Sequence, residues 1–306
     1  MHVQTVRGSI PPDEVKSTLI HEHLVFDLTP VRGDLDSKLY HDESLCKELD
    51  LLSGHGCNTI VEVSNRGMGQ NAEALRNIAI EHNLHIIAAT GYYKQEYYPA
   101  EVFEQTEQEL QQRMMQDIQA GIGETDICAG IIAEIGSSLN KITDAEKKVF
   151  RAAAHAQLQT GAPLSTHCEL GTMGSEQLEL LTTCGVSPKS ISFGHQDLNP
   201  DIKEQCELLE SGAYLQFDTI GKVSYRTDEE RAKQLYTLLD RGYEDQLMLS
   251  CDLTRQSHLL AAGGHGYAHL FTAFLPMLRA LGVSESIIYK MLTLNPRRFL
   301  AFHPIV

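Results

Sequence analysis

Eight short apolar runs rich in β-branched residues alternate with amphipathic segments along the whole 306-residue chain. Apolar runs of this length predict buried strands, and segments with apolar residues at i, i+3 and i+4 predict helices. The predicted strands are residues 17–21, 57–63, 85–91, 128–135, 162–167, 191–195, 213–218 and 247–252. Regular alternation of strands and helices indicates an α/β fold with a parallel sheet.

Helical spacing fills the intervals between these runs. The predicted helices are residues 43–54, 70–82, 101–120, 143–159, 175–183, 200–211, 228–241, 268–282, 284–292 and 295–302. Eight strand–helix units without a linker predict a single (β/α)8 TIM barrel over residues 1–306, with residues 1–16 covering its bottom. A doubly wound open sheet is the alternative, although no Gly-x-Gly-x-x-Gly sequence follows the first strand.

Composition and charge limit the kinds of molecule that we expect the protein to bind. A net charge of −16 disfavours nucleic acid, whose phosphates need a basic surface. The chain has no apolar window long enough to span a membrane and no apolar segment of a secretory signal at its start, so we expect a cytoplasmic protein. Seven cysteines without a Cys-x-x-Cys spacing argue against a disulfide framework. A small-molecule substrate is the favoured partner, and a homodimer is a reasonable expectation.

Ionisable residues end five of the predicted strands. His21 and His23 close the first strand, and residues two apart in a strand point to the same side. The other strand-end residues are Glu134, His167, His195 and Asp252. Each alone is compatible with an ordinary polar strand end, but barrel active sites lie where the strands end. Four imidazoles and two carboxylates exceed the needs of one tetrahedral ion and suit two ions that share a bridging carboxylate.

Together with the neighbouring sequence, this set resembles the phosphotriesterase-related branch of the amidohydrolase superfamily. The similar stretches are residues 19–24 (Leu-Ile-His-Glu-His-Leu), 133–136 (Ala-Glu-Ile-Gly), 216–222 and 252–259. The resemblance extends over essentially the whole chain. It implies a metal-dependent hydrolase acting on ester bonds, in which a metal-bridging hydroxide attacks a carboxylic ester or lactone.

The resemblance also implies a role for each strand-end residue. The more buried ion would be held by His21, His23 and Asp252, the more exposed ion by His167 and His195, and Glu134 would bridge the two. In phosphotriesterases proper the bridge is a carboxylated lysine, so the glutamate is a departure. Asp252 would also be the catalytic residue that takes the proton. Zinc suits these nitrogen and oxygen ligands, and manganese, cobalt and nickel are alternatives.

Two features bear on the substrate. Thr219 stands where phosphotriesterases have a histidine, and the chain has no tryptophan, so phosphotriester hydrolysis is only the alternative activity. A non-catalytic metal-binding barrel is a third hypothesis.

Two cations and one histidine beyond the strand ends are candidates for substrate binding. Lys222 follows the seventh strand and Arg255 the eighth, as in related lactonases that accept phosphorylated sugar lactones, which favours an anionic or phosphorylated substrate. His258 is a further candidate. The alternatives are that Arg255 pairs with a neighbouring acid, that Lys222 is solvated and that His258 caps a helix.

Overall fold

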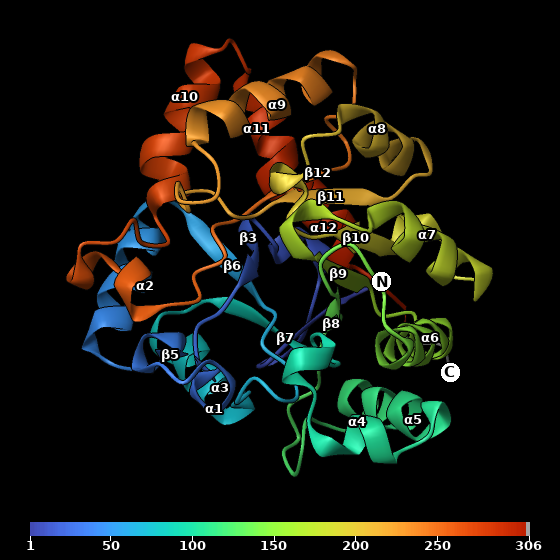
Figure 1. The fold of residues 1–306 in the computed structure, drawn as a ribbon. Coiled ribbons are helices and arrows are strands. Elements are labelled where there is room, and N and C mark those ends of the chain that lie inside the picture. The colour runs from blue at the N-terminus through green and yellow to red at the C-terminus, as the bar shows by residue number, and fades with distance from the viewer. Residues whose placement is uncertain (304–306) are drawn as a thin grey trace.

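Eight parallel strands form one rolled sheet in the computed structural model, which describes residues 1–303 (Figure 1). The strands are β3 (Ser17–Glu22), β6 (Cys57–Glu62), β7 (His85–Thr90), β8 (Ile131–Ser137), β9 (Leu164–Cys168), β10 (Ile191–Phe193), β11 (Tyr214–Phe217) and β12 (Leu247–Leu249). Their order in the sheet follows their order in the sequence. A doubly wound sheet needs a reversal of strand order, so the predicted (β/α)8 barrel is confirmed and the open-sheet alternative is wrong.

Helices surround the sheet (Figure 1). They are α2 (Glu43–Gly54), α3 (Ala72–Glu81), α4 (Ala100–Glu104), α5 (Glu107–Gln119), α6 (Asp144–Thr160), α7 (Gly174–Thr183), α8 (Ile202–Glu210), α9 (Asp228–Asp240), α10 (Leu275–Ala280), α11 (Glu285–Tyr289) and α12 (Asn295–Leu300). Within residues 1–303 none of the helices combines the length and the apolar character needed to cross a bilayer.

Two sequence-predicted helices differ from the structure for local reasons. The helix expected over residues 101–120 is two helices, because Thr106 and Glu109 form a reciprocal capping box that starts α5. The segment expected over residues 268–282 begins with a π-helical turn at Leu270–Phe274, directly before Pro276 in α10. A proline lacks the N–H of an α-helical hydrogen bond, which favours the wider turn ahead of it.

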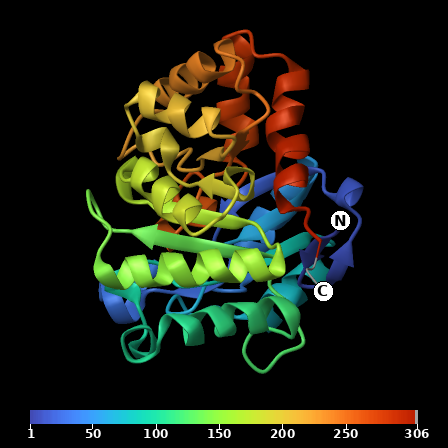
Figure 2. The same ribbon diagram turned by 90° about the vertical axis from the view of Figure 1, so that its right-hand side faces the viewer.

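The inside of the barrel is apolar and is closed at the bottom by both ends of the chain. Its inward-facing side chains include Val61, Ile87 and Ile131, and Val3 and Phe299 pack in the same cluster. The hairpin of β1 (Val3–Thr5) and β2 (Gly8–Ile10) lies beside the end of the C-terminal helix, where the His2 N–H donates to the Phe302 carbonyl at 3.0 Å (Figure 2). This end is filled by apolar packing, and the functional groups gather at the other.

The seam between β12 and β3 is joined by a side chain. Glu22 Oε1 accepts hydrogen bonds from Ser250 Oγ and from the Cys251 N–H, both at 2.7 Å, and Oε2 accepts one from the Leu253 N–H at 3.0 Å. Burial raises the pKa of Glu22 to about 7. Glu22 points away from the neighbouring histidines and closes the barrel.

Candidate metal centre

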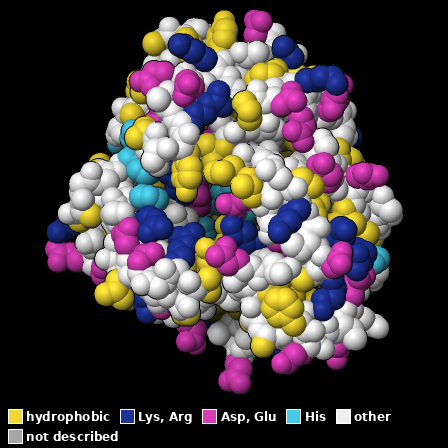
Figure 3. Space-filling view, viewed as in Figure 1, with side chains coloured by type: hydrophobic (Ala, Val, Ile, Leu, Met, Phe, Trp, Pro, Cys, Tyr) yellow, Lys and Arg dark blue, Asp and Glu magenta, His cyan; other side chains and the backbone are white. Residues whose placement is uncertain are grey.

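The six sequence-predicted ligand residues lie together at the base of a cavity of about 270 Å³, and Figure 3 shows this face of the molecule hollowed at its centre. Glu134 lies between two groups of side chains. Its Oε2 is 3.4 Å from His21 Nε2 and 3.1 Å from His167 Nδ1, and its Oε1 is 3.6 Å from His23 Nε2. Asp252 Oδ1 completes one group at 3.3 Å from His23 Nε2, and His195 Nε2 completes the other at 3.9 Å from Glu134 Oε2.

The backbone turns sharply at two of these positions. His195 and Asp252 have φ values of 57° and 51°, in the left-handed region. Such a conformation costs a non-glycine residue roughly 1–3 kcal/mol and is concentrated at functional sites. Gly194 permits the close approach, because a Cβ there would lie 2.6 Å from the Thr166 carbonyl oxygen and 3.2 Å from Asp218 Oδ2. The chain thus holds both side chains over the strand ends at a conformational cost.

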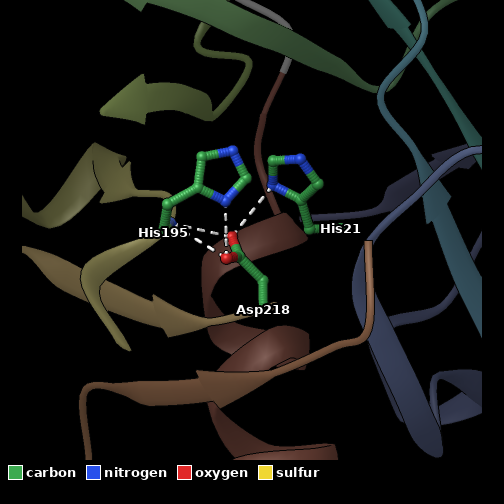
Figure 4. Close-up of side chains that lie close together, drawn as sticks. All are labelled: His21, His195 and Asp218. Atoms are coloured by element: carbon green, nitrogen blue, oxygen red, sulfur yellow. Dashed lines mark hydrogen bonds and ion pairs between the residues drawn. The ribbon is translucent and has the colours of Figure 1, made fainter. Parts of the chain in front are cut away.

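Asp218, at the end of β11, orients one histidine from each group (Figure 4). Its Oδ1 accepts a hydrogen bond from His195 Nδ1 at 2.8 Å, and its Oδ2 lies 3.1 Å from His21 Nδ1. Gln216 Oε1 also accepts from His21 Nδ1, at 2.9 Å. Because these partners accept, the Nδ1 atoms carry the hydrogens, and each Nε2 presents its lone pair to the centre.

The other two histidines are fixed in the same way. His23 Nδ1 donates to Ser64 Oγ at 2.8 Å, since the Ser64 hydroxyl itself donates to Glu62. His167 uses the opposite ring nitrogen: its Nε2 donates to Glu169 Oε2 at 2.8 Å, which leaves Nδ1 facing inward. Each of the four imidazoles therefore has one ring nitrogen held by a partner outside the centre and the other directed into it, as metal-binding histidines do.

The inward atoms fit a cation. His21 Nε2 is buried and has no hydrogen-bond partner, and His195 Nε2 lies 2.7 Å from His167 Nδ1, so these two inward-facing nitrogens are as close as a hydrogen-bonded pair. Burial lowers the pKa of His21, but Asp218 and Glu134 outweigh it and raise that pKa well above the usual value, so a proton occupies Nε2 when no cation does. A positive charge is thus favoured among these atoms, and nitrogen and carboxylate ligands are those of divalent transition metals.

The structure separates the three predicted substrate-binding residues. Lys222 lines the cavity, where its Nζ donates to Asp252 Oδ2. Arg255 is not among the lining residues, and its Nη1 is 3.3 Å from a carboxylate oxygen of both Asp34 and Asp36. His258 lies outside the lining as well, and its Nδ1 accepts from the Thr254 N–H at 3.3 Å. Only Lys222 is brought to the candidate metal ligands, because acids on the loop after β4 (Phe26–Asp27) engage Arg255.

Sequence reasoning missed several residues of the cavity wall, among them Arg32, Lys94 and Glu169. Glu169 had a usable signal, since it lies two residues beyond His167, the spacing that puts side chains on one face. Arg32 had none: it lies in the short helix α1 (Thr29–Arg32), well beyond the strand end.

Thr219 is held in a buried network next to Asp218. Its hydroxyl donates to Asp197 and accepts from Arg231 Nη2 at 2.9 Å. Arg231 and Asp197 form a fully buried ion pair with Nε and Oδ2 2.6 Å apart. Thr219 thus joins β11 to helix α9 through the arginine.

The fold and these side chains define a class: a (β/α)8 barrel of the amidohydrolase type with a metal centre at its strand ends. The Phosphotriesterase family matches residues 1–300. The chain therefore belongs to the Phosphotriesterase family and is a metal-dependent hydrolase. The predicted family and enzyme class are confirmed, and the non-catalytic barrel is set aside.

Individual relatives agree. Phosphotriesterase homology protein of Escherichia coli (strain K12) is 44% identical over 287 residues, which cover 94% of this chain and 98% of that protein. A crystal structure of phosphotriesterase homology protein from Escherichia coli, complexed with phosphate in the active site, has a TM-score of 0.93 at 43% identity and covers 95% of this chain and 100% of that one. N-acetyltaurine hydrolase of Danio rerio is 30% identical over 344 residues, with 98% of both chains covered. A lactonase from Listeria monocytogenes has a TM-score of 0.94 at 26% identity, covering 99% of this chain and 100% of that one.

Proposed function

We propose that this enzyme hydrolyses a carboxylic ester or lactone that carries a negative charge, with two divalent cations in the centre. The observation that supports this most strongly is the set of inward-facing histidine nitrogens around Glu134. His21, His23 and Asp252 would hold the more buried ion, and His167 and His195 the more exposed one. Zinc is the favoured metal, with manganese, cobalt and nickel as alternatives.

Such ions, when bound, lower the pKa of a coordinated water and polarise a substrate carbonyl. The protein contributes proton transfer and positioning. Asp252 faces the metal-binding histidines with Oδ1 and Lys222 with Oδ2. Burial raises the pKa of Asp252, but Lys222 and the histidines hold it well below its usual range, so the group is an ionised carboxylate, the form that can accept a proton. Asp252 is thus the proposed general base, with Lys222 holding it in place.

Two relatives support an anionic carbonyl substrate. The Listeria monocytogenes relative is a lactonase, and the Danio rerio relative hydrolyses N-acetyltaurine, whose taurine part ends in a sulfonate. Phosphotriester hydrolysis is the less favoured activity, because Thr219 is engaged by Asp197 and Arg231 and offers no imidazole for proton transfer.

A panel of substrates tests the proposal. Metal-loaded enzyme is assayed on neutral and anionic esters, lactones, N-acetyltaurine and a phosphotriester, with Asp252→Asn as the background. We expect turnover of anionic esters or lactones that the Asp252→Asn variant lacks. Phosphotriester turnover alone, or no rate above that background, contradicts the proposed function. A cytoplasmic location and a homodimer remain predictions from the sequence.

A further inference from the structure

Cationic side chains lie at the mouth of the cavity although the protein is strongly acidic. The chain has a net charge of −16, yet Lys and Arg side chains gather around the central hollow (Figure 3). Three cations line the cavity: Arg32, Lys94 and Lys222. Basic side chains around a hollow on an acidic protein attract anions to that point.

Two of these three cations are already neutralised. Lys94 Nζ pairs with Glu169, and Lys222 Nζ pairs with Asp252. Their positive charge is therefore used to hold carboxylates of the centre. Neither lysine has a full charge left for a ligand.

Arg32 differs from both lysines. Among residues 1–303 its guanidinium forms no ion pair, and its one hydrogen bond runs from Nε to the Tyr97 hydroxyl at 3.2 Å. The guanidinium carbon lies 5.7 Å from the centre of the Tyr97 ring, within the range of a cation–π contact. Both Nη groups thus remain available to a ligand in the cavity.

Arg32 is also held in place and connected to the metal-binding side chains. Its backbone N–H donates to the Leu28 carbonyl at 2.9 Å, which fixes the end of α1. The buried Tyr97 ring packs 5.0 Å from Tyr93, and Tyr93 packs 4.7 Å from His167, between ring centres. Two aromatic rings therefore form the wall from the arginine to the candidate metal centre.

We propose that Arg32 binds a compact oxyanion of the substrate, a sulfonate, carboxylate or phosphate group, while the ester or amide carbonyl lies at the metal centre. A guanidinium offers two parallel N–H donors, which match two oxygens of such a group. The role of Arg32 in substrate turnover rests on the proposed function. The binding of an oxyanion by Arg32 does not. It gives Arg32 the role that the sequence suggested for Arg255.

Matched acetate esters test the role. The substrates are 2-sulfoethyl acetate, 2-carboxyethyl acetate and 2-phosphoethyl acetate, with 2-methoxyethyl acetate as the neutral partner. The variants are Arg32→Gln, Arg32→Lys and Arg255→Gln. Arg113→Gln, on the outer helix α5 and outside the cavity lining, removes the same charge and is the control.

We expect Arg32→Gln to raise KM for at least one anionic ester by about 10- to 100-fold, the effect of losing a charged hydrogen-bonded pair. KM for the neutral ester should change less than twofold, and Arg113→Gln should change neither. Arg32→Lys should fall in between, because lysine keeps the charge but not the paired donors. The preferred ester identifies the oxyanion. Equal losses on charged and neutral esters, or a selective loss in Arg255→Gln alone, overturn the proposal.

A binding measurement separates this inference from the proposed function. Isethionate, the alcohol released from 2-sulfoethyl acetate, is titrated calorimetrically into metal-loaded enzyme, with 3-hydroxypropanoate and 2-hydroxyethyl phosphate in parallel. If no ester is hydrolysed, the proposed function fails, but weaker binding of one of these alcohols to Arg32→Gln than to Arg113→Gln still supports the anion site. Equal binding by the two variants, or none by the wild type, refutes it.

Discussion

We expect Asp218→Asn to weaken metal binding at one of the two proposed sites more than at the other. Asp218 is fully buried and accepts hydrogen bonds from histidines of both groups. His195 approaches Oδ1 with two donors, its Nδ1 at 2.8 Å and its backbone N–H at 2.9 Å. In the variant the amide oxygen should take that position, because it is the only acceptor left. The NH2 group then faces His21 Nδ1.

The substitution should mainly affect metal binding by His21. Its Nδ1–H would meet an N–H donor, so the ring either relies on Gln216 alone or moves its hydrogen to Nε2, the nitrogen that faces the centre. Loss of such a supporting partner typically weakens metal binding about 10- to 100-fold, equivalent to about 1.4–2.7 kcal/mol. We expect this loss at the ion held by His21, His23 and Asp252. Binding at His167 and His195 should change by less than a factor of about 5, since their partners remain.

Competition with a chromogenic chelator measures the two dissociation constants, and elemental analysis after dialysis counts the ions that remain. Asp117→Asn is the matched control, because Asp117 is a buried carboxylate that accepts from Arg66 and Thr90 and contacts no metal-binding side chain. It should destabilise the fold without changing either constant. If Asp218→Asn binds both ions as tightly as wild type, the assignment of tautomers is wrong.

Three further predictions follow from the same contacts. His167→Ala should lower the amount of bound metal from two ions toward one and abolish turnover without unfolding the protein. Elemental analysis, rate assays and circular dichroism measure these three effects. A variant that keeps two ions and full activity would contradict the assignment of His167 as a ligand. Glu22→Ala leaves the Ser250 hydroxyl and the backbone N–H groups of Cys251 and Leu253 without their acceptor at the barrel seam. The free energy of unfolding in urea should therefore fall by about 3 kcal/mol or more, and a loss below about 1 kcal/mol would show that the seam does not depend on Glu22. Burial raises the pKa of Glu62 in the folded protein to about 8, from an ordinary value of 4.5. The contribution of this group to the free energy of unfolding is therefore complete below pH 4.5 and is lost as the pH rises through 8. Glu62→Gln lacks this titratable group. Its free energy of unfolding relative to wild type should therefore increase by up to about 1.4 kcal/mol per pH unit between pH 4.5 and 8. A difference that stays constant over this range would mean that Glu62 is ionised in the folded protein.

The clustering of the candidate metal-binding residues could be predicted because each lies at or near the end of a strand. Strand periodicity fixes that His21 and His23 face one way, and closing a barrel brings all strand ends to one rim. The division of the helix expected over residues 101–120 could have been read from Thr106 and Glu109, whose capping box is a local signal.

The sequence by itself determined the eight-unit barrel and the rim on which nitrogen and carboxylate ligands meet, because both depend on spacing along the chain. Tertiary structure decided which cationic side chains are available to bind a substrate. Arg255 follows a strand end but is paired with Asp34 and Asp36, whereas Arg32 follows none and lines the cavity without a carboxylate partner among the described residues. It also decided that Asp218 accepts from two histidines of different strands. Pairings of this kind join residues far apart in sequence, so only the packing of the loops and strands fixes them.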